Sequence, residues 1–67
     1  MSWADVDYDL MDAVDGLRIA YNKLAHSADF TEGTGIGNKV QQLIDSIDSM
    51  QDKIKNLRAE VRREWEE

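Results

Sequence analysis

Three glycines fall within five positions of the segment Gly33-Thr34-Gly35-Ile36-Gly37-Asn38-Lys39, which leads into a region of helical periodicity. The first turn of a helix exposes backbone N–H groups and a partial positive charge, and glycine lets a ligand approach the backbone closely. Thr34 and Asn38 add hydrogen-bonding groups, and Lys39 adds a positive charge. The segment therefore predicts a site for a small anionic ligand such as a nucleotide.

Other residues would complete this site if the chain folds back on itself. A hairpin brings Lys23 and His26 toward Lys39, and Tyr21 or Phe30 would then stack on a base. The spacing matches neither a Walker loop nor a dinucleotide fingerprint, so a flexible connector is the competing interpretation. One hairpin is too thin to enclose a ligand, which places the site between subunits. The candidate ligand-binding residues are Gly33, Thr34, Gly35, Gly37, Asn38, Lys39, Lys23, His26 and Tyr21.

Catalytic residues are not predicted. A hydrolytic triad needs a nucleophile, a base and an orienting group within mutual reach. His26 is the single histidine, and its neighbour Ser27 points about 100° away from it on a helix. Cysteine is absent, which excludes disulfides and thiolate metal sites. We expect a protein that is not an enzyme and that uses no cofactor.

Aspartates recur at helical spacing in both halves of the chain, in the sets Asp5, Asp9, Asp12 and Asp45, Asp48, Asp52. Neither set includes a histidine or fits an EF-hand pattern, so solvated polar faces are favoured and no metal site is predicted. Acidic helical stripes also suit a protein that imitates nucleic acid. The basic C-terminal third would neutralise them internally, so mimicry stands as the second alternative.

Two long helices must position these residues. The apolar residues of the second half repeat at alternating intervals of 4 and 3, as in a coiled coil: Ile36, Val40, Leu43, Ile47, Met50, Ile54, Leu57 and Val61. The first half repeats the pattern with Trp3, Val6, Leu10, Ala13, Leu17, Ala20 and Leu24. We predict a helix over about 3–27, a loop over about 28–35 and a helix over about 36–66, with 1–67 as one domain.

Helix ends and loop have their own signals. Ser2 precedes Asp5 by three residues, which is the spacing of a capping box. Thr31 or Thr34 is the expected cap of the second helix. Phe30 is expected to fold back and close that end of the core.

Charge indicates an antiparallel hairpin. Residues 1–15 contain five aspartates and no base, whereas residues 53–63 contain five bases and one Glu. The hairpin lays these segments side by side, with Asp9 near Lys53 and Asp7 near Arg58 as candidate pairs. Such pairs contribute little individually, about 0–1 kcal/mol when exposed, but together they select the orientation.

The apolar stripes are wider than one pair of helices can bury. Such a surplus marks an interface, and the residues that we assign to it are Tyr8, Met11, Val14, Ile19, Tyr21, Ile44, Trp3 and Trp65. The fold class is therefore an all-α, coiled-coil-like two-helix antiparallel hairpin that assembles into a four-helix bundle or a larger helical oligomer. In architecture it resembles small bundle-forming hairpins such as the plasmid-copy-control Rop protein. No shared motif transfers residue roles.

Composition limits the partners. The formal net charge of −6 disfavours nucleic acid and anionic membranes. No apolar run reaches the ~20 residues of a membrane span, and no signal-peptide pattern opens the chain, so a cytoplasmic location is expected. We expect a homo-oligomer, with a dimer favoured, that binds another protein as an adaptor, assembly factor or inhibitor. Sequestration of a small anionic ligand is the alternative.

Overall fold

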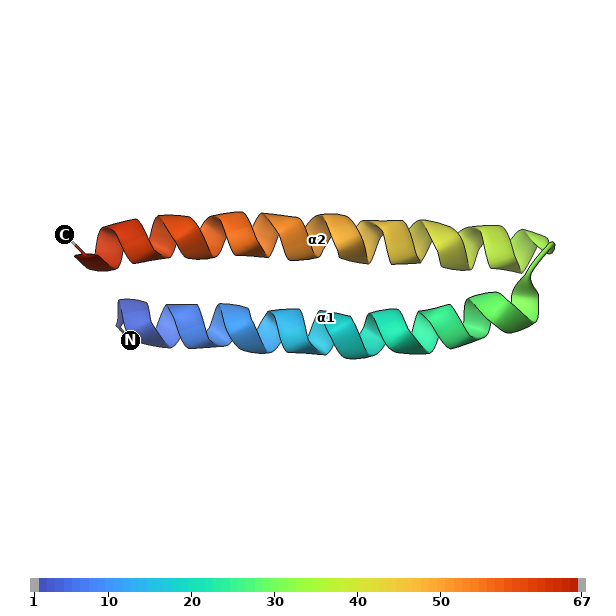
Figure 1. The fold of residues 1–67 in the computed structure, drawn as a ribbon, viewed down its shortest axis with the longest axis horizontal. Helices are drawn as coiled ribbons and strands as arrows, with labels where there is room; N and C mark the ends of the chain where they lie inside the picture. Colours follow the sequence, from blue (N-terminus) through green and yellow to red (C-terminus); the bar gives the residue numbers. More distant parts are fainter. Residues whose placement is uncertain (1, 67) are drawn as a thin grey trace.

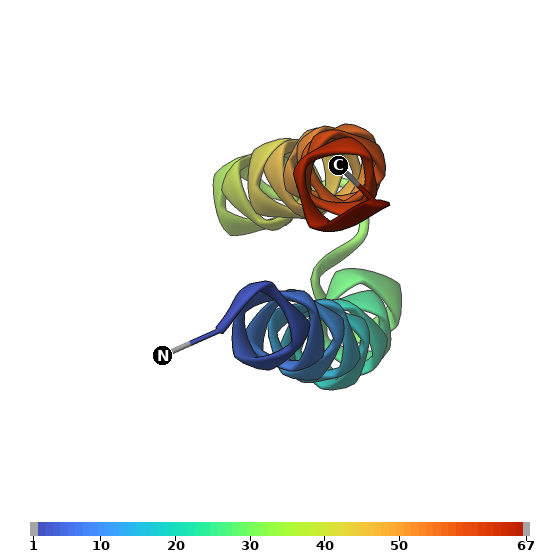
Figure 2. The same cartoon turned by 90° about the vertical axis from the view of Figure 1, so that its left-hand side faces the viewer.

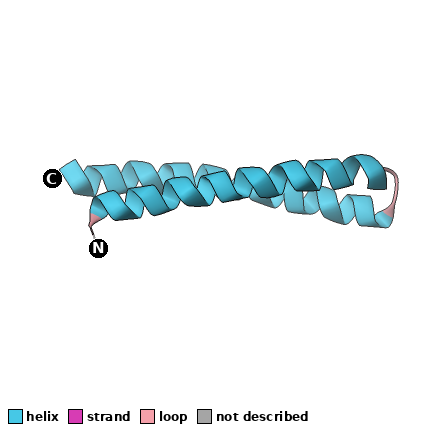
Figure 3. Ribbon diagram, turned by 90° about the horizontal axis from the view of Figure 1, so that it is seen from below, coloured by secondary structure: helices cyan, strands magenta, loops and turns pink. Residues whose placement is uncertain are grey.

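The computed structural model describes residues 2–66, which form one helical hairpin. Helix α1 spans Trp3–Thr31 and helix α2 spans Gly35–Glu66. The helices run antiparallel side by side, with both chain ends at one end of a rod that measures 51 × 15 × 13 Å (Figures 1 and 2). They cross at a shallow angle, as coiled-coil helices do (Figure 3). The predicted all-α hairpin is confirmed.

Hydroxyl side chains cap both helices. The backbone N–H of Asp5 donates to Ser2 Oγ at 3.3 Å, and the Ser2 N–H donates back to Asp5 Oδ2 at 3.1 Å. This reciprocal pair is the expected capping box. At α2, the Gly37 N–H donates to Thr34 Oγ1 at 2.9 Å, so Thr34 is the cap.

Helix α1 continues to Thr31, four residues beyond its expected end. The Thr31 hydroxyl donates to the Ser27 carbonyl at 2.7 Å, and the Ser27 hydroxyl donates to the Lys23 carbonyl at 3.3 Å. No glycine lies between the expected helix end at residue 27 and Gly33, whose φ of 80° turns the backbone out of the helix. The connection is therefore only 32–34.

The interhelical core is rotated by one residue from the predicted one. On α2 it follows Val40, Ile47, Ile54 and Val61, as expected, but its second row is Ile44, Gln51 and Arg58. The expected second row, Leu43, Met50 and Leu57, is exposed. On α1, Leu10, Leu17 and Leu24 lie in the core as predicted. Val14 takes the place of the exposed Ala13, and Tyr21 lies beside Ala20, which is itself half-buried.

The rotation has a physical cause. One partner helix covers only a narrow strip, so it cannot bury both rows of a wide apolar stripe. The rotated core takes in Val14, Tyr21 and Ile44, and it brings Arg58 to Asp7. Because Asp7 and Arg58 are charged, the periodicity of apolar residues alone does not indicate that they occupy core positions.

Three aromatic side chains leave the ends of the hairpin open. Phe30 is 93% exposed, so the expectation that it closes the loop end is wrong. Trp3 and Trp65 lie at the opposite end, and each is about half exposed. Because α1 stays helical through Thr31, Phe30 points outward from a continuous helix instead of folding back.

Candidate functional site

An exposed hydrophobic row runs along most of α2. Its members are spaced seven residues apart, so they share one face of the helix, and they are Ile36 (66% exposed), Leu43 (54%), Met50 (44%) and Leu57 (45%). We call this row the α2 stripe. It spans about 31 Å at 1.5 Å per residue. A contiguous apolar surface of this kind marks an interaction site on a protein.

Small residues of α1 lie on the same side of the hairpin. An approximate two-fold axis perpendicular to the hairpin relates antiparallel helices, so equivalent flanks share a side. The stripe residues each precede a core position of α2, and the equivalent α1 residues are Val6, Ala13, Ala20 and Ser27. Gly16 adjoins Ala13 and Ala20, and a Cβ added there would meet nothing within 4 Å. We call Ala13, Gly16 and Ala20 the small-residue row.

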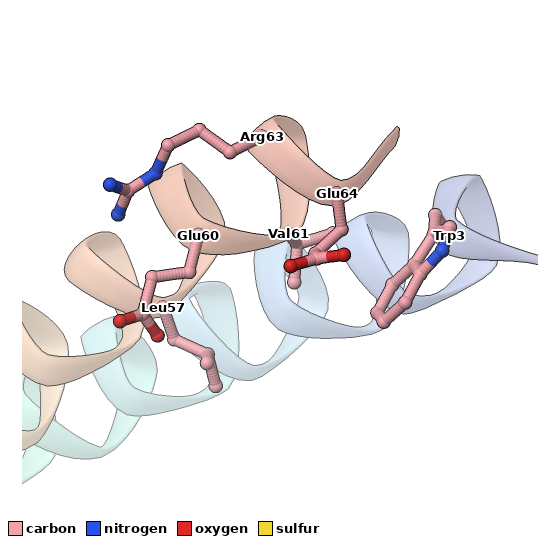
Figure 4. Close-up of a pocket in the computed structure, with 6 residues that line it drawn as sticks. All are labelled: Trp3, Leu57, Glu60, Val61, Arg63 and Glu64. Atoms are coloured by element: carbon pink, nitrogen blue, oxygen red, sulfur yellow. The ribbon is translucent and has the colours of Figure 1, made fainter. Parts of the chain in front are cut away.

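A hollow at the open end extends this surface. It has a volume of about 500 Å³ and draws its walls from both helices (Figure 4). Leu57 and Trp3 supply apolar walls, and the lining residues are Trp3, Leu57, Glu60, Val61, Arg63 and Glu64. The α2 stripe thus ends in a recess with an aromatic wall and charged edges.

One ion pair lies inside the interhelical core. Arg58 Nε donates to Asp7 Oδ1 at 3.0 Å, and Asp7 is buried. The hydrogen bond from Arg58 holds the pKa of Asp7 below its ordinary value of 3.8; desolvation opposes this, and the charges of Arg58 and Arg62 reinforce it. The predicted Asp7–Arg58 pair is therefore confirmed. Asp9 and Lys53 form no ion pair in the described part of the chain.

Basic side chains gather beside this pair. A shallower hollow of about 260 Å³ is lined by Lys55, Arg58, Ala59 and Arg62. Its residues lie on the flank of α2 opposite the α2 stripe, since they adjoin the core from the other side. The two flanks of α2 therefore differ in character, one apolar and one charged.

The residues predicted for the interface divide into two groups. Val14, Tyr21 and Ile44 lie in the interhelical core, because the core is rotated. The other five, Tyr8, Met11, Ile19, Trp3 and Trp65, are exposed. Ile19 lies on the side of α1 that faces away from α2, so it shares no surface with the α2 stripe.

The residues predicted for anion binding lie around the loop, but local structure accounts for several of them. The Gly37 N–H donates to Thr34 Oγ1, and the Asn38 N–H donates to the Thr34 carbonyl at 3.2 Å. A Cβ on Gly37 would collide with the Thr31 carbonyl, so close packing requires this glycine. Gly35 has open space around it.

The remaining members of that set lie on the two helices that flank the loop. Lys23, His26 and Lys39 are exposed, whereas Tyr21 contributes to the core. Within residues 2–66, no group of three His, Cys, Asp or Glu side chains is placed to hold a metal ion. In the same range, neither helix is both long and apolar enough to cross a bilayer.

Comparison with family models, curated proteins and solved structures finds no match for this chain. The periodicity of the sequence includes the α2 stripe in a heptad and predicts it to be core, whereas the structure exposes it. The residue that distinguishes this predicted core from the observed one is Ile44. With Val14 and Tyr21, it gives each helix an alternative second row that forms an equally regular core.

Proposed function

We propose that this protein is a non-enzymatic helical hairpin that associates with a second copy through the α2 stripe and acts by binding another protein. The observation that carries the proposal is the exposure of four large apolar side chains in one row of α2. A helix face of this kind is buried when a hairpin pairs with another hairpin in a four-helix bundle.

The surface area supports association. The hairpin exposes 5238 Å², whereas a compact monomer of its 7.7 kDa mass would expose about 4300 Å². The surplus of about 900 Å² is close to the roughly 800 Å² that each partner buries in a stable protein–protein interface. Pairing two hairpins would remove the surplus that an isolated rod carries.

Sedimentation velocity of matched variants tests the proposal. Leu43→Lys places a charge in the middle of the α2 stripe, and Ile19→Lys places one on an exposed apolar side chain away from it. We expect wild type and the Ile19 variant to sediment as dimers and the Leu43 variant as a monomer with unchanged helicity. A monomeric wild type, or equal effects of the two variants, would contradict the proposal.

Binding of a small anion at the loop and imitation of nucleic acid remain alternatives. The loop geometry favours a structural role for Thr34 and Gly37, which reduces the support for a ligand there. In the Asp7–Arg58 pair, one aspartate of the acidic segment is paired with a base within the hairpin, which reduces the support for mimicry.

A further inference from the structure

We propose that the second copy docks with its loop at the same end as the first, so that the α2 stripe of each copy packs on the small-residue row of the other copy's α1. This inference rests on the proposed self-association and specifies its geometry. Two hairpins can meet face to face by a two-fold axis in two ways. An axis along the rod gives the same-end arrangement, and an axis across the rod places the loops at opposite ends.

Side-chain size favours the same-end arrangement. There, α2 of one copy lies over α1 of the other. With the register set by the Asp7–Arg58 pair, Leu43 lies near Ala20 and Met50 lies between Ala13 and Gly16, whereas Leu57 lies near Val6 and Asp9. Large residues facing small ones interdigitate, and the helices keep an even separation. The opposite-end arrangement stacks the two α2 stripes on each other and the two small-residue rows on each other. The side with the two α2 stripes would then hold too much side-chain volume, and the side with the two small-residue rows would hold too little.

The open space at Gly16 also supports the same-end arrangement. A Cβ there would meet nothing within the hairpin, so neither helix of the same copy requires a glycine at this position. Glycine inside a helix is unfavourable by about 1 kcal/mol relative to alanine. Close approach of a bulky side chain from a second copy gives this glycine a role. Met50 lies at the height of Gly16, given that Asp7 pairs with Arg58.

Charge also distinguishes the two arrangements. The same-end arrangement sets residues 5–15, with five aspartates and no Lys or Arg, level with residues 50–60 of the second copy, which contain three bases (Lys53, Lys55 and Arg58) and two acids. In the opposite-end arrangement, matching the two α2 stripes sets residues 5–15 against residues 22–32. That segment contains Asp29 and Glu32 and a single base, Lys23. Segments of net negative charge would then face each other at both ends of the bundle.

One charge pair lies at the edge of the contact. Asp9 occupies the same helical row as Gly16, and Lys53 adjoins Met50 and Leu57. These two side chains form no ion pair within the hairpin, so both can meet opposite charges on the second copy. In the opposite-end arrangement, Lys53 would instead lie across from Lys39.

Spin-label distances between copies distinguish the arrangements. The sequence has no cysteine, so single labels can be placed at Glu32→Cys in the loop and at Arg63→Cys at the open end. We expect a short distance between two loop labels, well below half the 51 Å length of the rod. A mixture of loop-labelled and end-labelled chains should show a long distance. The reverse result would overturn this inference while leaving self-association intact, and a lack of any distance between copies would reject self-association itself.

Charge reversal provides a second readout. Lys53→Glu should weaken dimerisation about 3- to 10-fold, because the lost pair is counted twice in a symmetric dimer. The double variant Asp9→Lys with Lys53→Glu should restore it. Tighter dimerisation of the single variant would indicate relief of Lys53–Lys39 repulsion and overturn the same-end arrangement.

Discussion

At the residue scale, the Asp7–Arg58 pair is the one polar contact within the interhelical core of the described residues, and it ties the two ends of the chain together. Replacing one partner leaves the other charge without its hydrogen bond. Because the Asp7–Arg58 pair lies within the core, it also fixes which side of each helix faces the other.

Acid should weaken this contact. The folded state lowers the pKa of Asp7 below 3.8, so near and below that pH the unfolded chain binds more protons than the folded one. The stabilisation by Asp7 is present above pH 3.8 and is lost as the pH falls through the lowered pKa. Asp7→Asn should therefore be less stable than wild type at neutral pH, and the difference should shrink in acid. Thermal unfolding of both proteins from pH 7 to pH 2.5 measures this, and a constant difference would contradict the assigned role.

Ile44 and Leu43 are adjacent in sequence but have different roles. Ile44→Ala should destabilise the hairpin by about 2–4 kcal/mol at every protein concentration, because it removes buried volume. Leu43→Ala should act mainly through the dimer, so its effect should vanish on dilution. Urea unfolding at several protein concentrations separates these effects. If Leu43→Ala lost more stability than Ile44→Ala, and did so at every protein concentration, the result would support a core that contains Leu43 in place of Ile44.

At the element scale, the sequence predicted the two helices, the antiparallel topology and the Ser2 capping box, and it left Thr31 and Thr34 as alternative caps of α2, of which Thr34 is the cap. Apolar heptads, a Ser–Asp capping box and the asymmetric charges of the two termini are local or pairwise signals, and each identified its element. The rotation of the core could not be predicted in the same way. Val40, Ile47, Ile54 and Val61 belong to both possible cores, and the choice depends on how Arg58 reaches Asp7 across the hairpin.

The sequence likewise predicted one part of the loop structure and missed another. Its glycines indicated a break between helices, but they did not show that α1 continues to Thr31, with the Ser27 and Thr31 hydroxyls bonded to carbonyls one turn earlier. The proposed anion site depended on those glycines serving a ligand. Two of them have structural explanations, since Gly33 has a positive φ and Gly37 packs against Thr31.

Alanine substitutions test these explanations. Gly37→Ala should destabilise the hairpin because its Cβ collides with the Thr31 carbonyl, whereas Gly35→Ala, in open space, should be tolerated. Circular dichroism melting curves compare the two. Equal stability of the two variants would contradict the packing role of Gly37. Phosphate or nucleotide binding by wild type that is lost in the Gly35 variant, at unchanged stability, would revive the ligand-binding alternative.

At the scale of the whole molecule, the hairpin is a thin rod with more surface than its mass needs. Its core is one helix deep, so the apolar residues of α2 outnumber the positions that α1 can cover. In our proposal, a second copy supplies the missing layer, and the segregation of charge along the rod selects its direction. Binding of another protein would then use the remaining exposed surfaces, including the hollow at the open end.

Native mass spectrometry of the protein purified gently from cells, over a dilution series, tests self-association most directly. We predict a species of twice the 7.7 kDa chain mass that dissociates on dilution and carries no small-molecule adduct. A bare monomer at every concentration would contradict self-association and leave the α2 stripe for a different protein. An oligomer that retains a few hundred daltons per site would contradict the protein-binding proposal and favour sequestration of a small ligand.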